Sequence, residues 1–200
     1  MRNEEPQRGL GQLLSKERIE LEDGMLGQLE RFAALLLGWN GTHNLTGAKT
    51  LDAVYGNILD ALYPVTFVDR PGSLLDVGTG AGFPGLVLAI VWPQIRTVLT
   101  EPRNKRAAFL RYAATELGLS QVTVERRRVE EVTYAPFGLI TSRAVTDTAL
   151  LLQLTAHLRD AGTQFLFYKG AQAQEELAAL ETQPNYVIVQ NNKRNYVWIK

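Results

Sequence analysis

The sequence predicts an α/β fold: a doubly wound, mostly parallel sheet with an N-terminal helical appendage. Apolar strand-like runs alternate with helical periodicity from Ser73 onward, which is the order of βα units. A glycine-rich loop follows the first of these strands, as in folds that bind a cofactor at the carboxyl end of the sheet. The preceding residues show helical patterns alone. We therefore expect a helical appendage over 1–70 and a sheet domain over 71–200.

The appendage is expected to contain two helices. The first follows apolar residues at helical spacing over about 15–39. We expect Gly38 and Gly41 to end it, because glycine weakens a helix. The second helix is expected from about 50 to 62, with Thr50 as a possible N-cap.

A loop over 39–47, rich in Asn, Thr and Gly, is expected between these helices. Trp39 is expected to pack between the appendage and the sheet. His43 is expected to form hydrogen bonds in the loop rather than to act in catalysis. The polar stretch 1–11 contains proline and glycine, and we expect it to be frayed.

In the sheet domain, strands and helices are expected to alternate until a closing hairpin. The expected strands cover 73–76, 96–101, 121–125, 137–141, 165–168, 186–190 and 196–199, and the expected helices 86–90, 103–118, 147–158 and 175–180. The last two strands are separated by few residues, so they are expected to pair antiparallel, since a parallel pair needs a long crossover. We therefore expect a parallel sheet in which one strand is reversed.

Composition limits the possible functions. The chain has 200 residues, 21 Lys+Arg against 21 Asp+Glu, no cysteine and two histidines. Binding of nucleic acid would therefore need a local basic face, because the net charge is zero. The absence of cysteine excludes disulfides and cysteine-rich metal sites, and so few histidines predict no metal site. No apolar run approaches the ~20 residues that span a bilayer. We expect a cytoplasmic monomer without a membrane segment.

The four-glycine loop after the first strand is the main candidate for a cofactor site. Part of it matches G-x-G-x-x-G, the dinucleotide pattern. However, Pro84 removes one backbone donor for a pyrophosphate, and the Asp76 carboxylate is expected to point toward the loop and any phosphate. A cationic cofactor without phosphate tolerates both features. The run Asp76-x-Gly78-x-Gly80-x-Gly82 resembles motif I of class I S-adenosylmethionine-dependent methyltransferases, which implies a Rossmann-like fold and S-adenosylmethionine as cofactor.

Two further segments are expected to contact a nucleoside cofactor. Glu101 ends the second strand, where a carboxylate can accept hydrogen bonds from ribose hydroxyls; the alternative is a surface carboxylate paired with Arg103 or Lys105. Residues 129–131 follow the third strand and would lie at the adenine ring; the alternative is a solvated charge cluster. The expected cofactor-binding residues are Asp76, Gly78, Thr79, Gly80, Gly82, Phe83, Glu101, Val129, Glu130 and Arg143.

Arg143 ends the fourth strand, where methyltransferases place groups that face the methyl donor and acceptor. An arginine there can hold the surroundings of the cofactor or bind substrate phosphate. Six basic residues are expected to form an RNA-binding surface near the ends of the second and third strands: Arg103, Lys105, Arg106, Arg126, Arg127 and Arg128. The alternative is a solvated face, with the RNA surface around 39–49 and at Lys193-Arg194.

Six motifs occur in order along the chain. They are Trp39-Asn40-x-x-x-Asn44-Leu45-Thr46, Asn57-Ile58-Leu59-Asp60, the glycine run from Asp76 to Gly85, Lys105-Arg106-x-x-Phe109-Leu110, Arg128-Val129-Glu130-Glu131 and Ser142-Arg143-Ala144. Together they resemble the bacterial small-subunit ribosomal RNA guanine-N7 methyltransferases, known historically as glucose-inhibited division protein B. The resemblance covers about residues 39–200. It implies methylation of guanine N7 in small-subunit (16S) ribosomal RNA or in the small ribosomal subunit, with Arg143 and Asn44 in catalytic roles.

Two departures from the family pattern and two rival functions remain open. The family has His where this chain has Asn57, and Ser where it has Ala61. Either the segment contacts substrate differently or the chain is a divergent member. One rival function is a non-catalytic RNA-binding or ribosome assembly factor. The other, a nicotinamide-dependent oxidoreductase, lacks a Tyr-x-x-x-Lys proton donor in the expected place. Guanine N7 carries no proton, so a methyltransferase acting there needs no general base.

Overall fold

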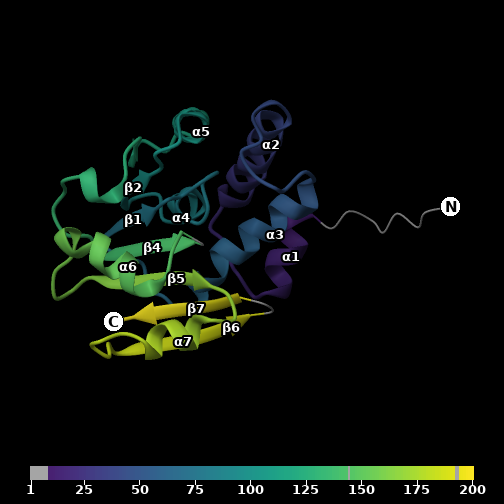
Figure 1. The fold of residues 1–200 in the computed structure, drawn as a ribbon. Helices are drawn as coiled ribbons and strands as arrows, with labels where there is room; N and C mark the ends of the chain where they lie inside the picture. The colour runs from purple at the N-terminus through teal and green to yellow at the C-terminus, as the bar shows by residue number, and fades with distance from the viewer. Residues whose placement is uncertain (1–8, 144, 192–193) are drawn as a thin grey trace.

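Seven strands form one sheet in the order β3-β2-β1-β4-β5-β7-β6 (Figure 1). The structure is a computed structural model that describes residues 9–143, 145–191 and 194–200. The strands are β1 (Ser73–Val77), β2 (Arg96–Thr100), β3 (Val122–Glu125), β4 (Leu139–Arg143), β5 (Gln164–Lys169), β6 (Tyr186–Asn191) and β7 (Arg194–Ile199). The first five run parallel, and β7 is antiparallel to β5 and β6. The predicted sheet with one reversed strand is confirmed.

Helices cover both faces of the sheet, as a doubly wound fold requires. They are α1 (Leu10–Lys16), α2 (Met25–His43), α3 (Leu51–Leu62), α4 (Gly85–Val91), α5 (Asn104–Glu116), α6 (Thr148–Leu154) and α7 (Ala173–Ala178), with short 3-10 turns η1 (Tyr63–Thr66), η2 (Val129–Glu131) and η3 (Ala156–Leu158). The buried side chains of α1 to α5 form one hydrophobic cluster with Leu74 of β1. Those of α6 and α7 form a second cluster with Leu75, on the opposite face.

The centre of the sheet is a topological switch point. The chain leaves β1 for β2 on one side, whereas β4 pairs with β1 on the other. In such sheets the loops after neighbouring strands diverge and leave a crevice at the carboxyl edge, where ligands bind. The register places Asp76 level with Leu99 of β2 and Thr141 of β4. The glycine loop after β1 therefore lies at the edge of the sheet where this fold class binds its ligands.

The predicted helix over 15–39 is wrong at both ends. The chain forms α1 and α2 instead, with residues 17–24 outside any helix. Gly38 and Gly41 do not end α2, which continues to His43 and is followed by Asn44 in the left-handed conformation. A glycine costs a helix only about 1 kcal/mol, which buried α2 side chains outweigh. The expected loop therefore begins after His43. Residues 9–11 of the stretch expected to fray are described, and the helix α1 begins at Leu10.

The second helix agrees with its prediction. The structure places it at Leu51–Leu62, and the Thr50 hydroxyl accepts a hydrogen bond from the Ala53 N–H at 3.2 Å. This is the N-cap that the sequence indicated, because the hydroxyl satisfies an amide that the first turn leaves without a helical partner.

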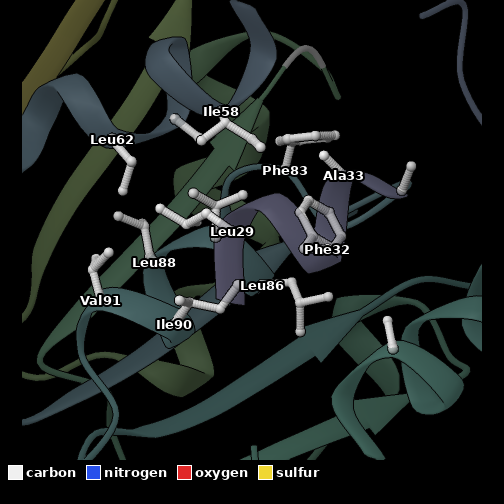
Figure 2. Close-up of a cluster of buried hydrophobic side chains, with 14 of the residues drawn as sticks. Leu29, Phe32, Ala33, Ile58, Leu62, Phe83, Leu86, Leu88, Ile90 and Val91 are labelled. Atoms are coloured by element: carbon white, nitrogen blue, oxygen red, sulfur yellow. The ribbon is translucent and has the colours of Figure 1, made fainter. Parts of the chain in front are cut away.

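The N-terminal helices pack into the same core as the sheet. Leu29 and Phe32 of α2 and Ile58 of α3 meet Leu86 and Leu88 of α4 in one buried cluster (Figure 2). This packing fixes α2 and α3 beside the carboxyl edge of β1 and β4. A domain boundary near residue 70 stays a prediction.

Candidate active site

Asp76 is the buried anchor of the glycine loop. Its side chain is fully buried, and Oδ2 accepts a hydrogen bond from the Gly85 N–H, at the start of α4, at 2.7 Å. Burial raises the pKa of Asp76 to about 6, although the Gly85 amide and the charge of Arg143 act to lower it. Within the described residues, Asp76 Oδ1 and Thr79 Oγ1 are buried and have no hydrogen-bond partner.

Gly80 and Gly85 serve different purposes in this loop. Gly80 has φ +62°, and a Cβ there would meet only Gly78 O and Arg106 Nη1, both at 4.0 Å. Its open side is the face at which a ligand could approach the backbone. At Gly85 a Cβ would lie 2.6 Å from Asp76 Oδ2 and 2.4 Å from Leu99 Cδ2. Gly85 therefore lets α4 approach β1 and β2.

The remaining residues predicted in this loop lie around that cradle. At Gly78 a Cβ would lie 2.6 Å from Val145 Cγ2, so the segment after β4 borders the loop. Gly82 packs against the core, because its Cβ would meet Phe32 Cζ at 3.2 Å. Phe83 is buried, with its ring centroid 5.4 Å from that of Phe32. We infer that Gly82 and Phe83 support the glycine loop on the side that faces the hydrophobic core.

Glu101 links the glycine loop to the end of β2. Only 3% of its surface is exposed. Oε2 accepts a hydrogen bond from the Gly80 N–H at 3.1 Å, and Oε1 accepts one from the Arg103 N–H at 2.8 Å. The Arg106 guanidinium lies 3.9 Å from Oε2. The alternative of a surface carboxylate paired with the Arg103 or Lys105 side chain is therefore wrong.

Arg143 is held at the end of β4 by three contacts. Its Nη1 donates to Asn57 Oδ1 at 3.0 Å and to Asp60 Oδ2 at 3.2 Å. Its guanidinium lies 4.8 Å from the centre of the Phe83 ring, within the range of a cation–π interaction. Asn57, which departs from the family pattern, thus contacts Arg143 directly, and Ala61 accepts a hydrogen bond from the Tyr168 hydroxyl through its carbonyl at 2.7 Å.

Asp60 belongs to one of the six family motifs, but the sequence alone indicated no role for it in the site. Besides Arg143, it binds Arg194 through two hydrogen bonds of 2.8 and 3.1 Å, and its Oδ1 accepts one from the Tyr196 hydroxyl at 3.2 Å. The carboxylate thereby joins α3, β4 and β7 at the carboxyl edge. The available signal was a single carboxylate in the apolar run 58–62 of a helix.

The predicted adenine segment and Asn44 lie apart from these contacts. η2 carries buried Val129 and exposed Glu130 directly beyond β3. Asn44 is exposed after α2, with φ +51°. The following loop is fixed by Asn40, whose side chain accepts from the Thr46 N–H and donates to the Ala48 carbonyl, both at 2.9 Å. No hydrogen bond joins Asn44 to another candidate within the described chain.

The six predicted RNA-binding residues lie beyond the neighbouring strands β2 and β3. Arg103, Lys105 and 126–128 are exposed, and Arg127 Nε lies 3.7 Å from Glu125. Arg106 differs, because its guanidinium faces Glu101 and the open side of Gly80. Of the six, Arg106 is thus the residue that contacts the cofactor cradle, and an RNA-binding role for the set stays a prediction.

Trp39 and His43 occupy other positions than expected. Both lie on the last turns of α2, and their rings pack 5.2 Å apart. Trp39 also contacts Phe109 and Tyr112 of α5, with ring centroids 5.6 and 5.3 Å apart. Its expected place against the sheet is therefore wrong: it packs against a helix. His43 belongs to a helix and makes no side-chain hydrogen bond in the described part of the protein.

The residues of the cradle fit S-adenosylmethionine. Among the described residues, Asp76 of β1 and Thr79 of the following loop have buried oxygens without partners, Gly80 in that loop has an open face, and the buried carboxylate of Glu101 follows the next strand. Such acceptors suit a cofactor with a cationic sulfonium, an ammonium group and ribose hydroxyls, and they would repel a pyrophosphate. No group of three His, Cys, Asp or Glu in the described ranges could hold a metal ion. No helix there is long and apolar enough to cross a membrane.

Comparison of structures identifies the fold. A methyltransferase from Geobacter sulfurreducens aligns with a TM-score of 0.62 over 95% of this chain and 96% of that chain, at 13% sequence identity. Such low identity establishes the fold alone. The fold is that of the class I S-adenosylmethionine-dependent methyltransferases.

Comparison of sequences then identifies the family. The family described as GidB, rRNA small subunit methyltransferase G, matches residues 25–197. The ribosomal RNA small subunit methyltransferase G of Aliarcobacter butzleri is 44% identical over 96% of this chain and 98% of that protein. The protein of the same name from Wolinella succinogenes is 45% identical over 92% and 94%. The chain belongs to this family, which confirms the resemblance inferred from its motifs, and its cofactor is S-adenosylmethionine.

Proposed function

We propose that this protein transfers the methyl group of S-adenosylmethionine to N7 of a guanine in small-subunit ribosomal RNA. The observation that carries the proposal is the family match over residues 25–197, because this range includes both the cofactor cradle and the contacts of Arg143. The bound cofactor supplies an electrophilic methyl group on a cationic sulfur.

The cradle would orient the cofactor through its acceptors. Asp76 and Thr79 present buried oxygens at the glycine loop, and Gly80 offers its open backbone. Glu101 would accept hydrogen bonds from ribose hydroxyls, in addition to the two amides that already position it. Val129 and Glu130 would border the adenine ring.

Catalysis would depend on alignment of the acceptor rather than on proton transfer. Guanine N7 has a lone pair and no proton, so the site needs no general base. Holding reactants in line can contribute about 7–11 kcal/mol. Arg143 is pre-positioned for this role, because Asn57 and Asp60 engage only its Nη1. Its other guanidinium N–H groups could donate to the O6 atom or a phosphate of the RNA. Asn44 would contact the same substrate from the end of α2.

Mapping of modified guanines tests the proposal. Small-subunit ribosomal RNA from cells lacking the protein should lose one 7-methylguanosine, which the wild-type gene restores and a Glu101→Ala variant restores only in part. A non-catalytic assembly factor would leave the modification intact while ribosome assembly suffered. An unchanged set of 7-methylguanosines would contradict the proposal.

We further propose that the protein acts as a cytoplasmic monomer on the RNA or on the small subunit. Among the described residues, the large exposed apolar side chains are Tyr112 on α5, Val145 between β4 and α6, Leu150 on α6 and Val187 on β6. These four do not form one broad apolar face of the kind that obligate dimers bury. Sedimentation equilibrium at micromolar concentration should give the monomer mass, and a dimer would contradict this proposal.

A further inference from the structure

A row of aromatic rings lies across the junction of α2 and α5, outside the cofactor cradle. Trp39 is its centre, with the rings of His43 and Tyr112 at 5.2 and 5.3 Å. The two helices lie side by side at the upper end of the molecule in Figure 1. Trp39 rests on the fully buried ring of Phe109, which itself packs against Phe32. The row is therefore supported from below by the core.

The outer side of this row is accessible. Tyr112 is 39% exposed, one of four large apolar side chains with such exposure in the described residues. His43 and Trp39 are half-buried. Exposed rings that are fixed by neighbouring rings lose little entropy when a planar ligand stacks on them. Nucleobases are such ligands, and single-stranded nucleic acids are commonly bound by stacking on aromatic side chains.

The charges of α5 favour a polyanion on the same face. Lys105 and Tyr112 are seven residues apart and both exposed, so they share one helix face about 10 Å apart along the axis. The only acidic residue of α5 is Glu116, and Arg31 neutralises it at 2.8 Å. An RNA strand laid along this face would therefore meet rings and a cation.

The location connects this face to the active edge. α5 begins at Asn104, three residues after Glu101, and Arg106, on its first turn, already faces Glu101. Lys105 lies next to Arg106, on the exposed side. The ring row lies further along the helix, away from the cradle, where it would meet RNA beside the target base rather than the target base.

We propose that His43, Trp39 and Tyr112 form a stacking platform for an unpaired stretch of small-subunit ribosomal RNA that flanks the target guanine, with Lys105 binding its phosphates. The proposal rests on the ribosomal RNA substrate proposed above and adds a second contact region for that substrate.

Binding of small-subunit ribosomal RNA tests the platform. Tyr112→Ala should weaken the affinity and raise the KM for RNA by about tenfold to a hundredfold, the usual loss for one stacked base. Tyr112→Phe keeps the ring and should stay within about twofold of the wild type. Val187→Ala, a change of an equally exposed apolar residue on β6, should alter neither quantity. S-adenosylmethionine affinity and thermal unfolding report whether each variant is folded.

Tryptophan fluorescence tests the stacking of RNA on Trp39 independently of the affinity measurements. The chain has three tryptophans, and Trp92 is buried. In a Trp198→Phe background, RNA should quench Trp39 at the concentrations at which it binds. If folded Tyr112→Ala binds RNA as tightly as wild type, or if saturating RNA leaves Trp39 unquenched, the rings are merely packing between α2 and α5 and the inference is wrong.

The outcomes separate this inference from the proposed function. If the wild type makes 7-methylguanosine but Tyr112→Ala has an unchanged KM for RNA, the platform fails and the function stands. If the wild type makes no 7-methylguanosine but RNA binding depends on Tyr112, the function fails and the platform stands.

Discussion

The two halves of the active edge are built in different ways. In the cofactor half, Asp76 and Glu101 accept hydrogen bonds from main-chain amides that are 2, 9 and 21 residues away in the sequence. In the substrate half, which we propose to face the substrate, Asp60 contacts Arg143 and Arg194 through side chains alone, across separations of 83 and 134 residues. The first half depends on the path of the backbone, whereas the second depends on the identity of each side chain.

This difference predicts which kind of substitution should disrupt each half. A carboxylate held by amides keeps its donors whatever side chains surround it, so the cradle should fail mainly when the backbone is displaced. A cluster of charged side chains is destabilised when one member is removed, because the remaining charges are left without partners. The following predictions test this contrast, from the largest expected effect to the smallest.

Gly85→Ala should cause the largest loss. The added Cβ would lie within 2.6 Å of Asp76 and Leu99 atoms, so α4 must move away from β1. We expect about 3 kcal/mol of lost stability and loss of cofactor binding, measured by urea unfolding and calorimetry. Gly38→Ala is the matched control, since a Cβ there meets nothing within 4 Å and alanine favours a helix. Equal effects of the two changes would contradict the close packing assigned to Gly85.

The pKa of Asp76 predicts how stability depends on pH. Its folded-state pKa of about 6 lies above the ordinary value of 3.8, so between these values the folded protein binds a proton that the unfolded chain has lost. Stability from this group is therefore present below pH 4 and is lost as the pH rises to 6, by about 3 kcal/mol in total. Asp76→Asn should remove this dependence, and the unfolding free energies of both proteins at pH 4 and 7 provide the measurement. Parallel profiles of the two proteins would show that Asp76 titrates normally.

Asp60→Ala should disrupt the substrate half alone. Removal of this carboxylate leaves Arg143 and Arg194 without their shared partner, and we expect about 2 kcal/mol of lost stability. Methyl transfer should fall further than cofactor affinity, which isothermal calorimetry measures separately. Glu116→Ala is the control, because its exposed pair with Arg31 should contribute less than about 1 kcal/mol. If transfer remains at the wild-type rate in folded Asp60→Ala, the placement of Arg143 does not limit the reaction.

The same contrast explains how much the sequence could predict. The glycine loop and Glu101 were predictable, because their main-chain contacts depend on strand ends and glycines, which the sequence shows directly. The Asp60 cluster was not, because nothing in the order of residues shows that α3, β4 and β7 meet. The end of α2 was predicted wrongly, because the packing of Leu29, Phe32 and Leu36 outweighs the local cost of Gly38 and Gly41.

Glu101→Ala should give the smallest effect. Loss of an acceptor for ribose hydroxyls should weaken S-adenosylmethionine binding by about tenfold, or ~1.4 kcal/mol. Glu125→Ala, at the corresponding end of β3, should leave the affinity unchanged. Calorimetry on both variants decides between cofactor contact and a purely structural link to Gly80 and Arg103. If the affinity of Glu101→Ala for S-adenosylmethionine is unchanged, Glu101 only holds the backbone at Gly80 and Arg103 and does not contact the cofactor.

Methyl transfer by the purified protein is the direct test of the proposed reaction at guanine N7. The protein would be incubated with labelled S-adenosylmethionine and unmodified small-subunit ribosomal RNA, free and in assembled subunits, and the digested nucleosides identified by mass spectrometry. We expect one label per RNA, present as 7-methylguanosine in at least one of the two substrates and strongly reduced by Asp60→Ala. Label at another atom or base, or no label in either substrate despite cofactor and RNA binding, would contradict the proposed reaction.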